Sequence, residues 1–165
     1  MLPYLATFGG SLVILATIQG WSRKGIGFRF WLFVSMMLPC LLAGFRAVSI
    51  GTDVSGYAEP LFDVARSCDT FSSFYNTDWL RHSTLRYTSA ADFEMGYVVL
   101  VWVASRVFST VQGLLFLTQL LTVIPLYWTL LRSKCDEALP YGVCVYLFMY
   151  FNQSLNMMRQ WIAVA

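Results

Sequence analysis

The sequence predicts an all-α protein, a polytopic bundle of transmembrane helices with an extracytoplasmic loop that carries short interfacial helices. Hydrophobic residues make up 58% of the chain and charged residues only 12%, against about 25% charged residues in a soluble domain. A chain of 165 residues cannot bury that much apolar surface away from water. The apolar residues also occur in long runs, and a helix needs about 20 such residues to cross a bilayer.

Five apolar segments are expected to build this bundle as a single transmembrane domain over residues 1–165. The third segment is shorter than a spanning helix, so we expect it to be partial or re-entrant and to be buried by protein. A further apolar run begins at residue 161, which leads us to expect a truncated chain. The expected segments are residues 2–21, 28–47, 96–108 (partial or re-entrant), 113–131 and 139–155.

The extracytoplasmic loop is expected over residues 48–94, the only polar stretch of any length. Apolar side chains recur there at helical spacing in two short stretches, which is typical of amphipathic helices that lie along a bilayer surface. We therefore predict two short interfacial helices in the loop. The apolar faces are Leu61, Ala65 and Cys68 in the first helix, and Phe71, Phe74, Tyr75 and Trp79 in the second.

Basic residues set the expected orientation, because cytoplasmic loops of membrane proteins carry an excess of Lys and Arg. Arg23 and Lys24 follow the first apolar segment, which places the N-terminus outside the cytoplasm. If the second basic turn at residues 132–134 is also cytoplasmic, residues 96–131 make one net crossing, and we favour this topology. It brings Arg159 to the same face as the polar loop. The alternative is two full crossings, with the second basic turn outside.

Several functional classes receive no support from the sequence. A net charge of +2 is too small to indicate a nucleic-acid partner. The cysteines lack a CxxC spacing, which favours small apolar side chains over a metal site or a disulfide. The sequence also lacks HExxH, Walker and GxGxxG patterns, and we predict no metal and no cofactor. The cysteines are Cys40, Cys68, Cys135 and Cys144.

The first group of candidate site residues lies where the second apolar segment ends. Arg46 and Asp53 flank a bend that Gly51 allows, and Tyr57 follows. Ionisable groups beside membrane segments are costly to keep there, which makes them candidates for function. The structural alternative is an Asx turn or a helix cap made by Asp53, with Arg46 reaching out to the polar interface.

The second group is Asp92 and Glu94, followed by Tyr97, at the start of the third apolar segment. Its structural alternative has Asp92 capping the next helix and Glu94 in the first helical turn, where the macrodipole favours an acid. The third group, between two apolar runs, is Asn156, Arg159 and Gln160. Its structural alternative is an anchor at the membrane interface.

Three segments that contain these groups occur in a particular order: GFRAVSIGTDVSGY at 44–57, FEMGYVVL at 93–100 and NMMRQWIAVA at 156–165. Together they resemble the EpsG family, Wzy-like membrane proteins of bacterial exopolysaccharide and capsule synthesis. The family pattern is Arg-Gly-x-x-x-Gly-Thr-Asp-x-x-x-Tyr, then Glu-x-Gly-Phe/Tyr, then Arg-Gln-x-Ile/Leu-Ala. Ala47 stands where the family usually has Gly, and Met95 where Pro is common. The family's members are roughly twice as long as this chain.

The resemblance implies a multi-pass protein of the bacterial inner membrane that polymerises undecaprenyl-diphosphate-linked oligosaccharide repeats on the extracytoplasmic face. A hydroxyl of one repeat unit would attack the anomeric carbon of another, and the lipid diphosphate would leave. Asp53 or Glu94 would act as the catalytic base. Arg46 and Arg159 would hold the phosphates. The other implied substrate contacts are Gly51, Thr52, Tyr57, Tyr97, Asn156 and Gln160.

The implied partners are the lipid-linked oligosaccharide, the lipid bilayer and other polysaccharide-export proteins. Two alternatives to a glycosyltransferase-type polymerase remain open. A transporter or flippase of lipid-linked sugar would place charged groups near the middle of the membrane, whereas here the charges other than Arg106 lie at one edge. A non-catalytic assembly partner of the polysaccharide machinery is the second alternative.

Overall fold

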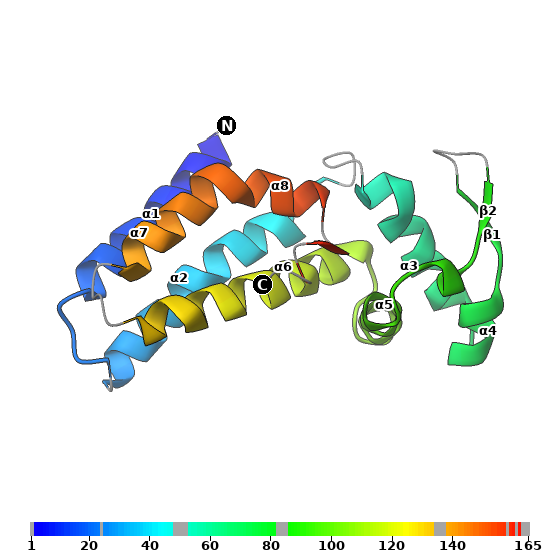
Figure 1. The fold of residues 1–165 in the computed structure, drawn as a ribbon, viewed down its shortest axis with the longest axis horizontal. Coiled ribbons are helices and arrows are strands. Elements are labelled where there is room, and N and C mark those ends of the chain that lie inside the picture. The colour runs from blue at the N-terminus through cyan, green and yellow to red at the C-terminus, as the bar shows by residue number, and fades with distance from the viewer. Residues whose placement is uncertain are drawn as a thin grey trace. The chain divides into compact units, whose positions relative to one another are not determined.

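Helices make up most of the structure, as the sequence predicts, and the chain folds into two compact units (Figure 1). Unit 1 contains residues 1–45 and 118–165, and unit 2 contains residues 46–117. The expectation of a single transmembrane domain stays a prediction. The computed structural model describes residues 2–23, 25–47, 53–81, 86–133, 138–157, 159–160 and 162.

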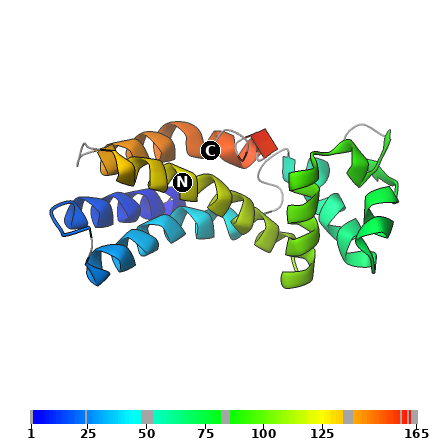
Figure 2. The same ribbon diagram turned by 60° about the horizontal axis from the view of Figure 1, so that its bottom comes forward.

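Unit 1 is built from apolar helices that pack side by side. Figures 1 and 2 both show α1 running along α2, and α1 also packs against α7. Leu15 and Ile18 of α1 are fully buried in this packing. The elements of unit 1 are α1 (Leu2–Ile18), α2 (Ile26–Gly44), most of α6 (Val111–Arg132), α7 (Ala138–Val145), η3 (Tyr146–Tyr150) and α8 (Phe151–Asn156).

A buried group of hydroxyls ties three helices of unit 1 together. Ser11 of α1 donates a hydrogen bond to the carbonyl oxygen of Ser35 in α2 over 3.0 Å. The hydroxyl of Tyr127 in α6 lies 2.9 Å from that of Ser35 and 3.4 Å from that of Ser11. Small hydroxyl residues allow helix backbones to approach closely and hydrogen-bond across the interface, which is how membrane helices commonly associate.

A second buried polar group joins α6 to the helical segment that follows it. The side-chain amide of Gln119 donates to the hydroxyl of Tyr146 over 2.5 Å, and Ser154 lies within 3.2 Å of the same hydroxyl. Tyr146 begins the π-helical segment η3 between α7 and α8. The expected apolar segment 139–155 is therefore helical throughout, with a widened turn at its middle.

Unit 2 is centred on the packing of α3 against α5. Leu61 and Ala65 on one side, and Val98 and Val101 on the other, have exposed fractions of 0%. The elements of unit 2 are η1 (Val54–Ala58), α3 (Glu59–Ser67), α4 (Phe71–Asn76), β1 (Trp79–Arg81), β2 (Arg86–Thr88), η2 (Ala90–Asp92), α5 (Met95–Val107) and the first turns of α6.

The expected loop does contain two short helices, α3 and α4, but the second is shorter than the pattern suggested. α4 ends at Asn76, and Thr77 takes an extended conformation with φ −80° and ψ 120°. Trp79 therefore does not lie on its apolar face; it starts an antiparallel hairpin in which it pairs with Thr88. Thr77 and Asp78 are poor helix formers, and the hairpin's pairing provides the competing interaction. That the helices lie at a bilayer surface stays a prediction.

Two helices of the described ranges, α2 and α6, are long and apolar enough to cross a membrane. α1 and α5 are apolar but have only 17 and 13 residues. At about 1.5 Å per residue, α5 extends for about 20 Å, less than the roughly 30 Å of the hydrocarbon core. The multi-pass arrangement of the whole chain stays a prediction.

Candidate functional site

Asp53 and Tyr57 form a hydrogen-bonded pair at the start of the first helical segment of unit 2. The hydroxyl of Tyr57 donates to Oδ2 of Asp53 over 2.6 Å. The pairing is local, because residues four apart in a helical turn face each other. Asp53 is half-buried, and Tyr57 is only 3% exposed. A carboxylate accepts several hydrogen bonds, so this one leaves acceptor positions for a ligand.

The structural alternative for Asp53, an Asx turn or a helix cap, is wrong. Asp53 precedes η1, but its side chain makes no capping hydrogen bond. Its own backbone is already helical, with φ −71° and ψ −31°, whereas a capping residue normally has extended dihedrals. The carboxylate therefore bonds forward to a tyrosine hydroxyl instead of to the backbone.

Aromatic contacts bring the two motif segments of unit 2 together. The ring of Tyr57 lies 5.7 Å from that of Phe93 and 5.9 Å from that of Tyr97, measured between centroids. Tyr97 is 5% exposed. Two stretches some 40 residues apart in sequence thus share one aromatic cluster. The spacing of the motifs alone does not predict this contact, because the hairpin between them decides how the chain returns.

Two members of the cluster are not among the site residues that the sequence predicts. Phe93 lies inside the FEMGYVVL segment, and Trp79 stacks on it with centroids 6.5 Å apart and planes 16° apart. Trp79 is 8% exposed, and its buried indole N–H has no hydrogen-bond partner among the described residues. The aromatic pair Phe93 and Tyr97 in one motif is a usable signal, whereas only the hairpin brings Trp79 into place.

The second group of site residues is arranged differently from the expected cap. Asp92 does not cap α5; its Oδ2 accepts from the backbone N–H of Ser89 over 2.9 Å, in a capping box on the turn η2. Phe93 then takes an extended conformation, with φ −113° and ψ 159°, which separates that turn from α5. Glu94 is consequently the exposed residue that precedes α5 and lies outside its first turn.

A comparison with protein families identifies the family of this chain. The model of the EpsG family matches residues 29–165, which include all three motif segments. The chain belongs to the EpsG family. Membership indicates a membrane protein connected with polysaccharide biosynthesis. No curated protein and no solved structure matches the chain.

The EpsG-family motif residues outside the aromatic cluster occupy several environments. Arg46 is 6% exposed, which is unusual for an arginine and differs from the interface-reaching side chain of the structural alternative. Gly51 and Thr52 lie outside the described residues.

The third group belongs to unit 1: Asn156 donates from its side chain to the carbonyl oxygen of Asn152 over 3.0 Å, near the end of α8.

Arg159 and Gln160 follow in helical conformation, with Arg159 half-buried and Gln160 exposed. Because they belong to unit 1, their meeting with Asp53 and Glu94 of unit 2 stays a prediction. What the structure assembles in this EpsG-family chain is a carboxylate oriented by a tyrosine, whose ring packs against other aromatic rings. A carboxylate can accept a proton from a hydroxyl, and aromatic rings commonly line ligand sites.

Proposed function

We propose that this EpsG-family protein polymerises lipid-diphosphate-linked oligosaccharide repeats by glycosyl transfer. The observation that carries the proposal is the hydrogen bond from Tyr57 to Asp53, together with the packing of the Tyr57 ring against Phe93 and Tyr97. The Tyr57 ring joins two of the three family motifs, and its hydroxyl holds a carboxylate. Sugar rings present C–H faces to aromatic side chains and hydroxyls to carboxylates, so this combination suits a carbohydrate substrate.

The proposed reaction joins two repeat units. A hydroxyl oxygen of the acceptor repeat forms a bond to the anomeric carbon of the donor repeat. The bond from that carbon to the lipid diphosphate breaks, and the diphosphate leaves with the electron pair. The hydroxyl proton passes to Asp53, whose second role is to hold the hydroxyl in line for attack. Glu94, exposed before α5, is the alternative base.

The leaving diphosphate needs cations, and the proposal assigns them to Arg46 and Arg159. A guanidinium group binds phosphate oxygens with two parallel hydrogen bonds. Stabilising the charge that develops on a leaving group is often the largest catalytic contribution of an enzyme site. Tyr57 and Tyr97 are proposed to contact the sugar rings through the small exposed part of each side chain, 3% and 5%. The remaining proposed contacts are Gly51, Thr52, Asn156 and Gln160.

The packing of unit 1, taken with the excess of Lys and Arg in cytoplasmic loops, supports a multi-pass topology with this site outside the cytoplasm of a bacterial cell. The side chain of Arg23, in the turn between α1 and α2, donates to the carbonyl oxygen of Leu131 over 2.7 Å. The first basic turn and the end of α6 therefore lie at the same end of unit 1 (Figure 1). If α2 and α6 both cross, the residues between them begin and end on the opposite side. This arrangement favours one net crossing over residues 96–131.

Cysteine labelling in intact cells measures this topology. Asp69→Cys places an exposed thiol after α3, and Ser22→Cys places one in the first basic turn. In a background without the native cysteines, we expect an impermeant maleimide to label only the Asp69→Cys protein. The Ser22→Cys protein should react only after permeabilisation. Restored native Cys135, outside the described residues, should behave like Ser22→Cys; labelling of Cys135 from outside would instead indicate two full crossings.

Reconstitution tests the proposed activity directly. The intact protein, purified into liposomes with lipid-linked repeat units on one face, should produce glycan chains longer than one repeat, resolved by gel electrophoresis. Movement of the repeats across the bilayer without elongation would assign a flippase instead. Neither elongation nor movement would leave a scaffolding role and contradict the polymerase. Protein-free liposomes are the control.

A further inference from the structure

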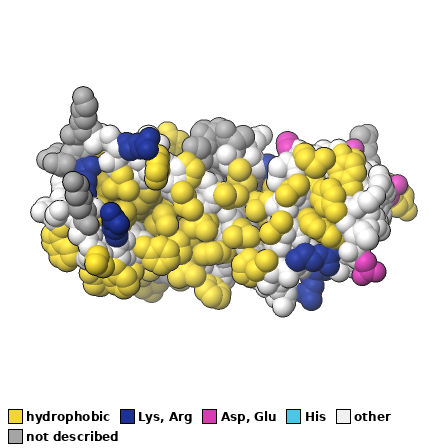
Figure 3. All heavy atoms as spheres, turned by 90° about the horizontal axis from the view of Figure 1, so that it is seen from below, with side chains coloured by type: hydrophobic (Ala, Val, Ile, Leu, Met, Phe, Trp, Pro, Cys, Tyr) yellow, Lys and Arg dark blue, Asp and Glu magenta, His cyan; other side chains and the backbone are white. Residues whose placement is uncertain are grey.

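Three arginines gather at one end of unit 1, outside the three motif segments. Arg23 lies in the turn after α1, Arg29 in the first turn of α2, and Arg132 at the end of α6. All three are exposed. Figure 3 shows basic side chains at this end beside a continuous hydrophobic surface. In sequence, residues 22–29 and 132–137 contain five basic and two acidic side chains.

Two of these arginines are held in place by neighbouring groups. The guanidinium group of Arg132 lies over the ring of Trp128, 4.4 Å from its centroid. Arg23 is fixed by its hydrogen bond to the carbonyl oxygen of Leu131. Immobilising these long side chains in advance lowers the entropy cost of binding a ligand at this end.

An apolar groove between α2 and α6 opens beside the arginines. Its volume is about 310 Å³, near the lower end of the range of ligand pockets. Arg29 lines one end of the groove. Met36, two turns further along α2, also lines it, so the groove extends at least that far along the helix. Between them the groove walls are apolar: Leu32 and Phe33 from α2, and Ile124, Trp128 and Leu131 from α6.

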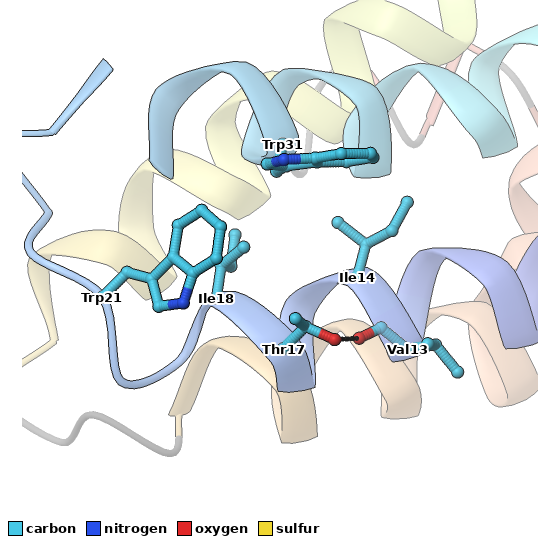
Figure 4. Close-up of a pocket in the computed structure, with 6 residues that line it drawn as sticks. All are labelled: Val13, Ile14, Thr17, Ile18, Trp21 and Trp31. Carbon is cyan, nitrogen blue, oxygen red and sulfur yellow. Dashed lines mark hydrogen bonds between the residues drawn. The ribbon is translucent and has the colours of Figure 1, made fainter. Parts of the chain in front are cut away.

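Tryptophan side chains mark the same end as a membrane–water interface. Trp21, Trp31 and Trp128 have exposed fractions of 45%, 41% and 57%. Figure 4 shows Trp31 of α2 above a smaller pocket and Trp21 at one side of it, with Ile14 and Ile18 of α1 also in its lining. Exposed tryptophans are typical of the headgroup level of a bilayer, where the ring is apolar and the indole N–H meets water. In a bilayer, arginines at this level lie close to the lipid phosphates.

We propose that the groove between α2 and α6 binds one anionic glycerophospholipid of the surrounding leaflet. The phosphate contacts Arg29 and Arg132, and one acyl chain lies along the apolar walls. Basic pockets between membrane helices commonly bind anionic headgroups. The charge of the arginines and the apolar length of the groove match the two parts of a phospholipid.

The inference rests on insertion of unit 1 in a bilayer and not on polymerase activity, so it is measured by lipid binding alone. The intact protein is reconstituted in nanodiscs that contain phosphatidylglycerol with a photoactivatable acyl chain. Mass spectrometry should place the crosslinks in residues 29–36 and 124–131. The double variant Arg29→Gln with Arg132→Gln should lower the yield about 25-fold, because each arginine near an anionic surface contributes about fivefold to binding.

Matched variants separate the groove from general membrane contact. Arg66→Gln removes the same charge from an exposed arginine of unit 2 and should leave crosslinking to residues 29–36 unchanged. Met36→Trp fills the groove while keeping both arginines, and it should lower the crosslinking of the acyl chain. Protein that elutes as a monodisperse peak shows that each variant is folded.

Three results would overturn the proposal. Equal crosslinking of the double variant and the wild type would remove the role of the arginines. Equal crosslinking of a photoactivatable phosphatidylcholine, which has no net charge, would show that the groove does not select anionic lipid. Competition by millimolar inorganic phosphate as strong as that by unlabelled phosphatidylglycerol would assign a free-anion site. Selective, arginine-dependent labelling that inorganic phosphate does not reduce is the expected result.

Discussion

Asp53→Asn is expected to abolish polymer formation while the protein still inserts in the membrane. The amide keeps the shape of the side chain but cannot accept the proton of the attacking hydroxyl. General bases contribute about 10²–10⁴-fold to the rate, so polymer length and amount should fall by at least two orders of magnitude. Electrophoresis of extracted polysaccharide measures the loss, and immunoblotting of membrane fractions checks insertion.

Two further variants decide whether the carboxylate itself matters. Asp63→Asn makes the same change at an exposed position of α3 and should leave polymer formation unchanged. Tyr57→Phe removes the hydroxyl that donates to Asp53 Oδ2 but keeps the ring, so a smaller loss, of about tenfold, is expected. Wild-type amounts of polymer from the Asp53→Asn protein would contradict the role of Asp53 as the base. Glu94 would then be the remaining candidate.

Arg159→Ala is expected to have the second large effect. Removing a group that stabilises developing negative charge costs about 10²–10³-fold in rate in enzymes where it has been measured. Arg159→Lys should recover part of the activity, because lysine keeps the charge but loses the two parallel hydrogen bonds to phosphate. The elongation assay with purified protein gives the rate of each variant.

The matched control for this loss is Arg66→Ala, which removes an exposed arginine of unit 2 outside the proposed site. It should retain elongation. Topology provides an independent check, because Arg159 acts on the leaving diphosphate only if it faces the extracytoplasmic side. A thiol at the neighbouring Gln160→Cys that reacts only from the cytoplasm would contradict the assignment of Arg159, whatever the activity.

Helices are the part of the fold that the sequence predicts well. The apolar runs end where Gly, Ser and charged residues cluster, and the structural helices end within a few residues of those points. The loop helices α3 and α4 also follow from apolar spacing. The hairpin does not, because strands of three residues carry too little periodicity to compete with the helical pattern around Trp79.

The site was predicted less completely than the fold. Asp53, Tyr57 and Tyr97 follow from the family motifs, and in the structure Tyr57 contacts both of the others. Asp53 makes no cap, and Asp92 caps the turn η2 instead of α5, because capping depends on the dihedrals of one or two residues. Whether Arg159 joins the cluster depends on how unit 1 meets unit 2, and local sequence carries no such information.

The sequence by itself determined that the chain is helical and apolar, that a polar region separates its apolar runs, and that it carries the motifs of the EpsG family. These properties are local, since each depends on composition or on spacing within a few helical turns. Only the tertiary structure decided that Tyr57 meets Phe93 and Tyr97, that Trp79 stacks on Phe93, and that Arg23 reaches the end of α6. Such contacts join residues distant in the chain, and they form because side-chain packing and hydrogen bonding select one return path among many that the sequence pattern allows.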